Sequence, residues 1–267
     1  MNHANMLSSG MTDLWEIAPD VAGLRTMFVN IAYVGEPSSD WILVDTGLGK
    51  FARSIRDVAR ERFGKPPAAI ILTHGHFDHI GTVKELVEEW NVPVYAHPLE
   101  LPYLNGQQDY PEADPSVGGG LLAMVSSMYP NKGIDLGSAI KPLPQDGSVP
   151  GAKGWQWVHT PGHSPGHISL FRPSDKILLA GDAFITVKQE SVFAVLMQQQ
   201  EVHGPPTYFT TDWEEAEQSV RKLALLDPQI ALTGHGQPMK APELSVQLAH
   251  VCKNFQEIAV PEQGKFV

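Results

Sequence analysis

The sequence predicts a four-layer αββα sandwich, in which two mixed β-sheets pack face to face and helices cover their outer sides. Three observations lead to this fold class. Short apolar, β-rich runs alternate with amphipathic helical patterns, in the order β-rich, α, β-rich, α. No segment has the composition of a linker between two cores, so residues 1–267 are expected to form a single domain. Hydrophobic residues make up 42% of the chain, which is enough for a sizeable core.

The first half of the chain is expected to alternate between strands and helices. Its elements, in chain order, are strands at 26–34 and 41–47, a helix at 51–63, a strand at 68–73, a helix over 83–90 and a strand in 91–98. The run at 68–73 is short and continuously apolar, which is typical of a buried strand. The helix over 83–90 is expected because its apolar residues recur at positions i, i+3, i+4 and i+7.

The second half is expected to contain a series of short strands and two helices. The strands are expected at 154–162, 167–172, 176–182 and 229–236. Thr211 and Glu214 fit a capping box that opens the first helix. Its inward residues are expected to be Trp213, Ala216, Val220 and Leu223. The last helix is expected to start near Pro242. Two segments, 104–135 and 183–212, show no regular pattern.

Charge and cysteine content exclude several classes of protein. The formal net charge is −11 with neutral histidines, which argues against a nucleic-acid-binding surface because such a surface needs a basic face. The single cysteine, Cys252, excludes an internal disulfide and a cysteine-based zinc site. No apolar stretch has the length of a membrane span, and the start of the chain does not resemble a signal peptide. We therefore expect a soluble, cytoplasmic protein that binds neither nucleic acid nor a membrane.

Four polar residues directly after the strand at 68–73 form the strongest motif. His74, His76, Asp78 and His79 fall within six positions, in a chain that has 11 histidines in all. Histidine and aspartate bind zinc and similar ions without help from cysteine. The spacing is too tight for one ion to use all four side chains, so a pair of ions is expected to divide them.

Three later residues complete the expected ligand set. His163, Asp182 and His235 each stand where an apolar strand gives way to a small, glycine-containing turn. Such turns bring side chains into a common cleft on rigid supports. One ion would bind His74, His76 and His163. The other would bind Asp78, His79 and His235, and Asp182 would bridge the two.

With these residues in place, the chain resembles the metallo-β-lactamase-fold hydrolases. The segments VDTG (44–47), THGHFDHIG (73–81), HTPGHSPGH (159–167), AGDAF (180–184) and TGHG (233–236) occur in the order of that superfamily. The resemblance spans roughly residues 25–240 and implies an αββα sandwich with a dinuclear zinc site, although iron and manganese suit the same ligands. The branch it resembles contains glyoxalase II, lactonases and stand-alone bacterial hydrolases.

The resemblance implies that a hydroxide bridging two zinc ions cleaves an ester, a lactone or a thioester of a small molecule. Asp78 is expected first as a ligand and also as a residue that orients a proton, and Tyr208 as a hydrogen-bond donor to the oxyanion. Asp45 is expected either to support a ligand histidine or to cap a turn. His167, four residues after His163, is expected to support the site or pack beside it rather than line the cleft.

Two long irregular segments, 101–130 and 186–210, are expected either to cover the metals or to form a contact in a homodimer. In the first reading, the walls of an apolar substrate pocket would be Tyr103, Met124, Phe193, Met197 and Tyr208. Two other activities fit the same fold. One is an iron-dependent persulfide dioxygenase, and the other is a phosphodiesterase, which the acidic charge balance disfavours.

Overall fold

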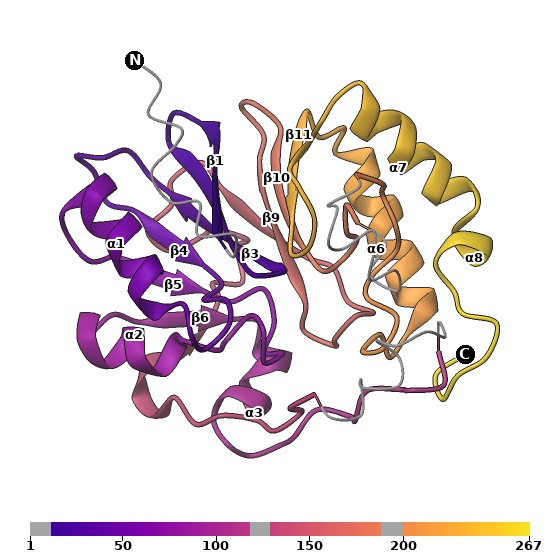
Figure 1. Cartoon of the computed structure of the whole chain (residues 1–267), viewed down its shortest axis with the longest axis horizontal. Helices are drawn as coiled ribbons and strands as arrows, with labels where there is room; N and C mark the ends of the chain where they lie inside the picture. The colour runs from indigo at the N-terminus through magenta and orange to yellow at the C-terminus, as the bar shows by residue number, and fades with distance from the viewer. Residues whose placement is uncertain (1–11, 118–128, 188–199) are drawn as a thin grey trace.

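The computed structural model describes residues 12–117, 129–187 and 200–267. Two β-sheets lie side by side in the middle of the molecule, and helices cover the outer face of each sheet (Figure 1). The first sheet contains strands β1 to β7, and the second sheet contains strands β8 to β12. The expected four-layer αββα sandwich is therefore confirmed.

The first sheet has seven strands in sequential order. They are β1 (Thr12–Ala18), β2 (Val21–Thr26), β3 (Val29–Val34), β4 (Ile42–Val44), β5 (Ala69–Ile71), β6 (Val94–Ala96) and β7 (Ile140–Pro142). Strands β1 to β4 pair antiparallel, whereas β4, β5, β6 and β7 pair parallel. The parallel part of the sheet brings the carboxyl ends of its strands to one edge, from which the first candidate site residues project.

The second sheet has five strands in the order β12-β11-β10-β9-β8. Their bounds are β8 (Gln156–His159), β9 (Ile168–Arg172), β10 (Ile177–Gly181), β11 (Ile230–Thr233) and β12 (Met239–Lys240). Strands β10 and β11 are parallel, and the other pairs are antiparallel. The carboxyl ends of β10 and β11 therefore lie next to each other.

The helices form the two outer layers. On the first sheet they are α1 (Ala52–Phe63) and α2 (Val83–Trp90), followed by the short η1 (Pro98–Glu100), α3 (Leu101–Leu104) and η2 (Gly137–Ala139). On the second sheet they are α6 (Trp213–Leu225), α7 (Glu243–Lys253) and α8 (Phe255–Ile258). Within the described part of the chain, no helix combines the length and the apolar character needed to cross a bilayer.

Three apolar clusters hold the four layers together. Strand residues alternate between them, because successive side chains of a strand point to opposite faces. In β4, Leu43 packs under α1 and α2, whereas Ile42 and Val44 face the second sheet. In β10, Leu179 faces the first sheet and Leu178 packs under α6 and α7. Burial on both faces of each sheet explains why these strands are continuously apolar.

The beginning of the first sheet differs from the expectation. Residues 26–34 were expected to form one strand, but Thr26 ends β2, and Met27 and Phe28 make a turn into β3. Met27 has a φ of 67°, which breaks the extended backbone. The hairpin of β1 and β2 was not expected at all, because polar and apolar residues do not alternate regularly along β1, where Leu14 and Glu16 are exposed.

The start of α6 is one residue later than the capping box predicts. The carboxylate of Asp212 accepts a hydrogen bond from the N–H of Glu215 at 2.9 Å, so Asp212 is the N-cap. The capping box of Thr211 and Glu214 is therefore wrong. Thr211 instead contacts the backbone oxygen of Gly162. The four inward residues expected for this helix are all buried.

Candidate metal centre

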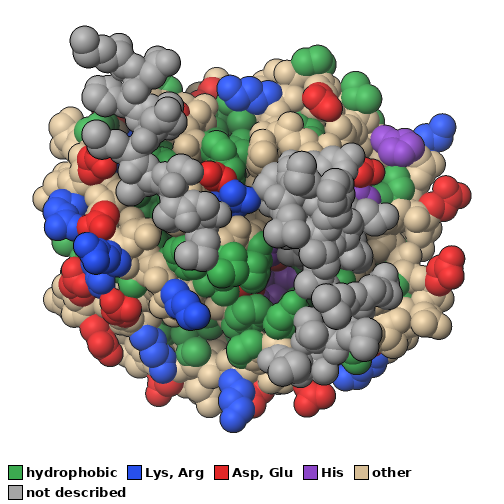
Figure 2. All heavy atoms as spheres, in the orientation of Figure 1, with side chains coloured by type: hydrophobic (Ala, Val, Ile, Leu, Met, Phe, Trp, Pro, Cys, Tyr) green, Lys and Arg blue, Asp and Glu red, His purple; other side chains and the backbone are tan. Residues whose placement is uncertain are grey.

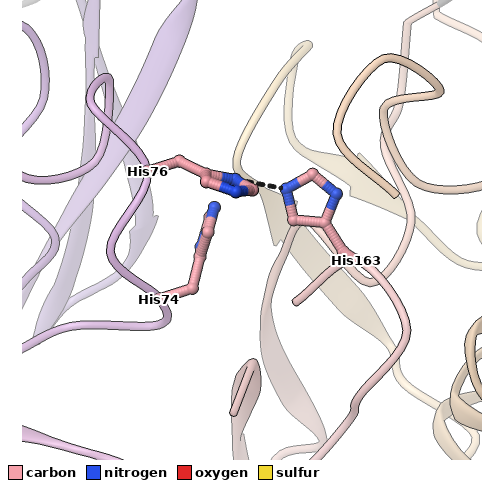
Figure 3. A group of neighbouring side chains, drawn as sticks. All are labelled: His74, His76 and His163. Carbon is pink, nitrogen blue, oxygen red and sulfur yellow. Dashed lines mark hydrogen bonds between the residues drawn. The ribbon is translucent and has the colours of Figure 1, made fainter. Parts of the chain in front are cut away.

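The seven expected ligands come from four loops, each of which follows a strand. His74, His76, Asp78 and His79 lie between β5 and α2. His163 follows β8, Asp182 follows β10 and His235 follows β11. Figure 3 shows His74 and His76 on the loop of one half facing His163 on the loop of the other. The structure therefore brings all seven residues together where the two sheets meet.

The first group consists of His74, His76 and His163. One ring nitrogen from each lies within 4.8 Å of the others. Nδ1 of His76 is 2.9 Å from Nε2 of His163 (Figure 3). The opposite nitrogens of two of these rings contact threonine hydroxyls: Thr73 lies 3.0 Å from Nδ1 of His74, and Thr210 lies 3.2 Å from Nδ1 of His163. These contacts set the rotation of the two rings and leave their Nε2 atoms facing the group.

The second group consists of Asp78, His79 and His235, whose candidate ligand atoms also lie within 4.8 Å of one another. Nε2 of His235 is 3.5 Å from Oδ2 of Asp78. The outward nitrogen of each histidine is again held. Nδ1 of His79 is 2.8 Å from Oδ2 of Asp45, and Nδ1 of His235 is 2.9 Å from the backbone oxygen of Phe28. Both Nε2 atoms therefore face the centre of the group.

Asp182 lies between the two groups. Its Oδ2 atom is 3.5 Å from Nε2 of His163 in the first group. The same atom is 3.4 Å from Nε2 of His79 and 3.2 Å from Nε2 of His235 in the second. Asp182 also forms a third cluster of candidate ligand atoms with His74 and His79. This is the position expected for a carboxylate between two ions.

Asp45 contacts two parts of the candidate site. Its Oδ1 accepts a hydrogen bond from the N–H of Thr73, and its Oδ2 accepts one from the Thr73 hydroxyl, both at 2.8 Å. Oδ2 also contacts His79. Asp45 is buried and has a φ of 60°, an uncommon backbone conformation that aspartate tolerates better than most residues. The residue thus holds one histidine directly and the start of the histidine-rich loop through Thr73.

His167 supports the backbone of Asp182. Its Nε2 accepts a hydrogen bond from the N–H of Asp182 at 2.8 Å, and its Nδ1 donates to the backbone oxygen of Thr160 at 3.1 Å. Burial lowers the pKa of His167 to about 4, so the ring is neutral at pH 7. Only one ring nitrogen of a neutral histidine carries a proton, which agrees with one donated and one accepted bond.

Burial and charge act differently on the site histidines. Burial lowers the pKa of His76 to about 3 and also depresses the pKa of His74 and of His163. Burial opposes protonation of His79 as well, but the carboxylates of Asp182, Asp45 and Asp78 together raise its pKa above the usual value. The three-histidine group therefore presents neutral imidazole nitrogens, which is the form that binds metal.

Several buried atoms of the site make no hydrogen bond within the described residues. They are Nε2 of His74, Nε2 of His79 and Oδ1 of Asp182. A buried polar atom without a partner destabilises a fold by about 1–3 kcal/mol. Three such atoms in one cluster fit a site built for cations, because nitrogen and carboxylate donors are satisfied together when an ion binds them.

Three half-buried aromatic rings lie beside the first group, and sequence reasoning missed all of them. The ring of Phe209 is 4.9 Å from that of His76, and Phe77 stacks on Tyr129 at 5.5 Å. Tyr129 and Phe209 are 5.9 Å apart, so the three form one patch. Figure 2 shows histidine atoms in a depression near the middle of one face, with hydrophobic side chains around them. Of the three, only Phe77 lies within the histidine-rich motif at 73–81, and this was the one sequence feature that could have pointed to the patch.

The pocket walls expected from the sequence are only partly described. Met124, Phe193 and Met197 lie outside the described residues. Tyr103 stacks on Tyr110 at 3.9 Å, and Tyr110 in turn packs against His76 at 4.5 Å. Tyr103 is thus separated from the site by one ring.

Tyr208, expected to donate a hydrogen bond to the oxyanion, is buried with Ala113 and Val117 and packs next to Phe209. Its catalytic role stays a prediction.

Comparison with known proteins agrees with this geometry. The model of the metallo-beta-lactamase superfamily matches residues 24–235. The probable metallo-hydrolase YflN of Bacillus subtilis (strain 168) is 47% identical over 248 residues, which cover 91% of this chain and 94% of that protein. The hydroxyacylglutathione hydrolase GloC of Haemophilus influenzae is 24% identical over 211 residues, or 78% of this chain and 85% of that one.

A solved structure with a similar fold is also found. TTHA1623, described in a di-iron-bound form, is 28% identical with a TM-score of 0.55, over 79% of this chain and 89% of that chain. The family model spans well over half of the sequence, and YflN is similar along nearly its whole length. This chain therefore belongs to the metallo-beta-lactamase superfamily.

Proposed function

We propose that this metal-dependent hydrolase binds two divalent metal ions and cleaves an ester, lactone or thioester bond of a small molecule. One observation carries the proposal: seven buried histidine and aspartate side chains from four loops turn their ligand atoms toward a common centre. A carboxylate between two groups of three gives each group access to a shared oxygen donor. This arrangement favours a pair of ions over a single one.

His74, His76 and His163 would hold one ion, and Asp78, His79 and His235 the other, with Asp182 between them. Zinc is favoured because imidazole and carboxylate ligands suit it, and iron and manganese accept the same set. TTHA1623, which shares the fold, has been described with two irons. The proposal therefore specifies two divalent ions and takes zinc as the first metal to test.

When bound, divalent ions supply a water that ionises near neutral pH and polarise the carbonyl oxygen of the substrate. The chain supplies the rest. The carboxylate of Asp78 lies at the edge of the second group, 3.5 Å from His235, and is proposed both to bind metal and to orient a proton. Asp45 and His167 keep the ligands in place. Tyr208 is proposed to donate a hydrogen bond to the developing oxyanion.

The aromatic patch of Phe77, Tyr129 and Phe209 supports a substrate with an apolar part. The rings are half-buried, and Phe209 contacts His76, so an alkyl or aryl group next to the scissile bond would cover them. The name of GloC states that this similar protein acts on a hydroxyacylglutathione, which is a thioester. Carboxylic esters, lactones and thioesters are therefore the substrate classes to test first.

The test is elemental analysis of protein purified without added metal, followed by hydrolysis assays on lactones, thioesters and aryl esters. About two zinc ions per chain and activity on one of these classes are expected. His74→Ala should abolish the activity, whereas His250→Ala, which removes an exposed histidine on α7, should not. About one iron per chain with oxygen uptake would replace the proposal by persulfide dioxygenase chemistry. Activity only on phosphodiesters would replace it by the other alternative.

A further inference from the structure

We propose that Glu100 is a positioning residue that assembles the three-histidine half of the metal centre. Its carboxylate joins the loop that carries His74 and His76 to the loop that carries His163. The inference rests on the proposed function, because it concerns the same two metal sites. Glu100 stands at the end of η1 and was not singled out by any sequence motif.

The Glu100 carboxylate binds both loops at once. Oε2 accepts hydrogen bonds from the N–H of Gly75, at 3.1 Å, and from the hydroxyl of Tyr110. Oε1 accepts from the hydroxyl of Ser164, at 2.7 Å, and from the N–H of Gly166, at 2.9 Å. Oε1 thus bonds the loop after β8. Oε2 bonds the loop after β5 together with Tyr110, whose hydroxyl oxygen also accepts from the N–H of Gly75, at 2.9 Å.

The bonded positions are directly next to the proposed ligands. Gly75 is the residue between His74 and His76, and Ser164 follows His163 in the chain. The loop after β5 belongs to the first sheet, and the loop after β8 belongs to the second. Within the described residues, no strand pairing joins these two loops. One backbone hydrogen bond, from the N–H of Ile168 to the oxygen of Thr73 at 3.0 Å, links their outer ends. The Glu100 carboxylate adds the link at Gly75 and Ser164, directly beside the histidines, and so helps to set how far His163 stands from the other two.

The two glycines allow this close approach. A Cβ atom at Gly166 would lie 2.7 Å from Cγ of Glu100 and 2.9 Å from its Oε1. A Cβ atom at Gly75 would lie 2.7 Å from the hydroxyl oxygen of Tyr110. All three distances are too short for carbon. A side chain at Gly166 would push its loop away from the carboxylate, and a side chain at Gly75 would push against Tyr110, whose hydroxyl bonds the same carboxylate. Both positions therefore need glycine for the loops to stand this close to Glu100 and Tyr110.

Packing alone does not explain a carboxylate at this position. Glu100 is fully buried, and burial raises the pKa of its carboxyl group, while the four hydrogen bonds oppose that rise. An apolar side chain of similar volume would fill the space without this desolvation cost. What an apolar residue cannot do is accept hydrogen bonds from two loops together. The hydrogen bonds to both loops therefore explain why this position holds a glutamate.

The second group of ligands is held by other contacts. His79 depends on Asp45, and His235 depends on the backbone oxygen of Phe28. Neither contact involves Glu100. Loss of the Glu100 link is therefore expected to weaken one metal site and leave the other, whereas a general loss of structure would weaken both.

The experiment measures zinc binding to the metal-free protein by competition with a coloured chelator. Glu100→Gln is the main variant. The amide nitrogen of glutamine takes the place of one carboxylate oxygen and is a donor, not an acceptor. It would then face the backbone N–H of Gly75 or of Gly166, and these N–H groups are fixed in direction by the backbone. One of two zinc affinities is expected to fall about 10–100-fold, and the other to stay within about threefold of the original protein. Glu88→Gln, the same change on the exposed face of α2, is the control and should alter neither affinity.

The outcomes separate the two proposals. If the unmodified protein binds fewer than two zinc ions, the proposed function fails, whatever Glu100 does. If it binds two and Glu100→Gln retains both affinities, or loses both equally, the positioning role is overturned and the proposed function stands. Should Glu100→Gln not fold, Ser164→Ala removes a single donor and should weaken the same site to a smaller extent. Unchanged affinities in Ser164→Ala would then overturn the inference.

Discussion

Oδ2 of Asp45 lies 2.8 Å from Nδ1 of His79 and accepts a hydrogen bond from the hydroxyl of Thr73 at the same distance. That hydroxyl is in turn 3.0 Å from Nδ1 of His74. One carboxylate oxygen therefore sets the orientation of a histidine in each group of candidate ligands. Asp45 and Glu100 divide the support of the site: Asp45 acts on both groups, and Glu100 acts on the first group alone.

Replacing Asp45 by asparagine is expected to weaken both zinc affinities, each by about 10–100-fold. The amide keeps the volume of the side chain and tolerates the positive φ, but it provides one acceptor where the carboxylate provides two. Chelator competition measures the effect, and Asp40→Asn is the matched control at an exposed position. Loss of only one affinity would show that the contact through Thr73 does not reach His74.

Replacing His167 by alanine is expected to lower kcat about 10–100-fold, because the backbone of Asp182 loses the acceptor that holds it. The orphaned N–H of Asp182 should also lower the free energy of unfolding by about 1–3 kcal/mol. Steady-state kinetics and urea unfolding measure the two effects. His250→Ala serves as the control for the loss of an imidazole at the surface. An unchanged kcat in a destabilised protein would limit His167 to a role in packing.

Replacing Phe209 by alanine is expected to discriminate between substrates. The half-buried ring covers His76, and losing its contact with an apolar group should lower kcat/KM for a hexanoyl ester by about tenfold. An acetyl ester with the same leaving group is too small to make this contact and should be affected less. Leu225→Ala, a change at an exposed apolar residue, is the control. An equal loss of kcat/KM for both esters would show that the acyl group does not bind against Phe209.

The residues that meet in the candidate site could be picked out from the sequence, because each one is marked locally. His74, His76 and Asp78 stand in one short motif, and the later ligands follow apolar strands whose ends must meet in a layered α/β fold. The layers were predictable for a related reason, since continuously apolar runs require cover on both faces. At these positions the local sequence pattern and the tertiary fold agree, so the fold could be inferred from the pattern.

The supporting residues were not predictable in the same way. Glu100 lies 25 residues from Gly75 and 64 from Ser164, and nothing in its own segment indicates that these loops meet. Tyr129 and Phe209 likewise become neighbours only through loop packing. The hairpin of β1 and β2 was missed because its residues alternate weakly. Contacts of this kind depend on tertiary structure, whereas propensity and periodicity describe only neighbours in the chain.

A histidine pair outside the site leads to a prediction about pH. The rings of His97 and His159 stack at 4.1 Å with an angle of 8° between their planes. Burial and the neighbouring His159 lower the pKa of His97 from 6.5 to about 4. Nδ1 of His97 also accepts a hydrogen bond from the N–H of Leu99 at the start of η1. The neutral ring is thus part of the folded structure.

Between pH 6.5 and about 4, the unfolded chain binds a proton at His97 that the folded chain does not, so stability falls as the pH falls through this window. Above pH 6.5 both states are neutral, and this contribution is fully present. His97→Asn keeps an acceptor for Leu99 but cannot be protonated. Its loss of stability from pH 7.5 to pH 5, measured by urea unfolding, should therefore be smaller than that of the original protein. His250→Asn is the surface control, and an identical pH dependence in His97→Asn and the original protein would contradict the assignment.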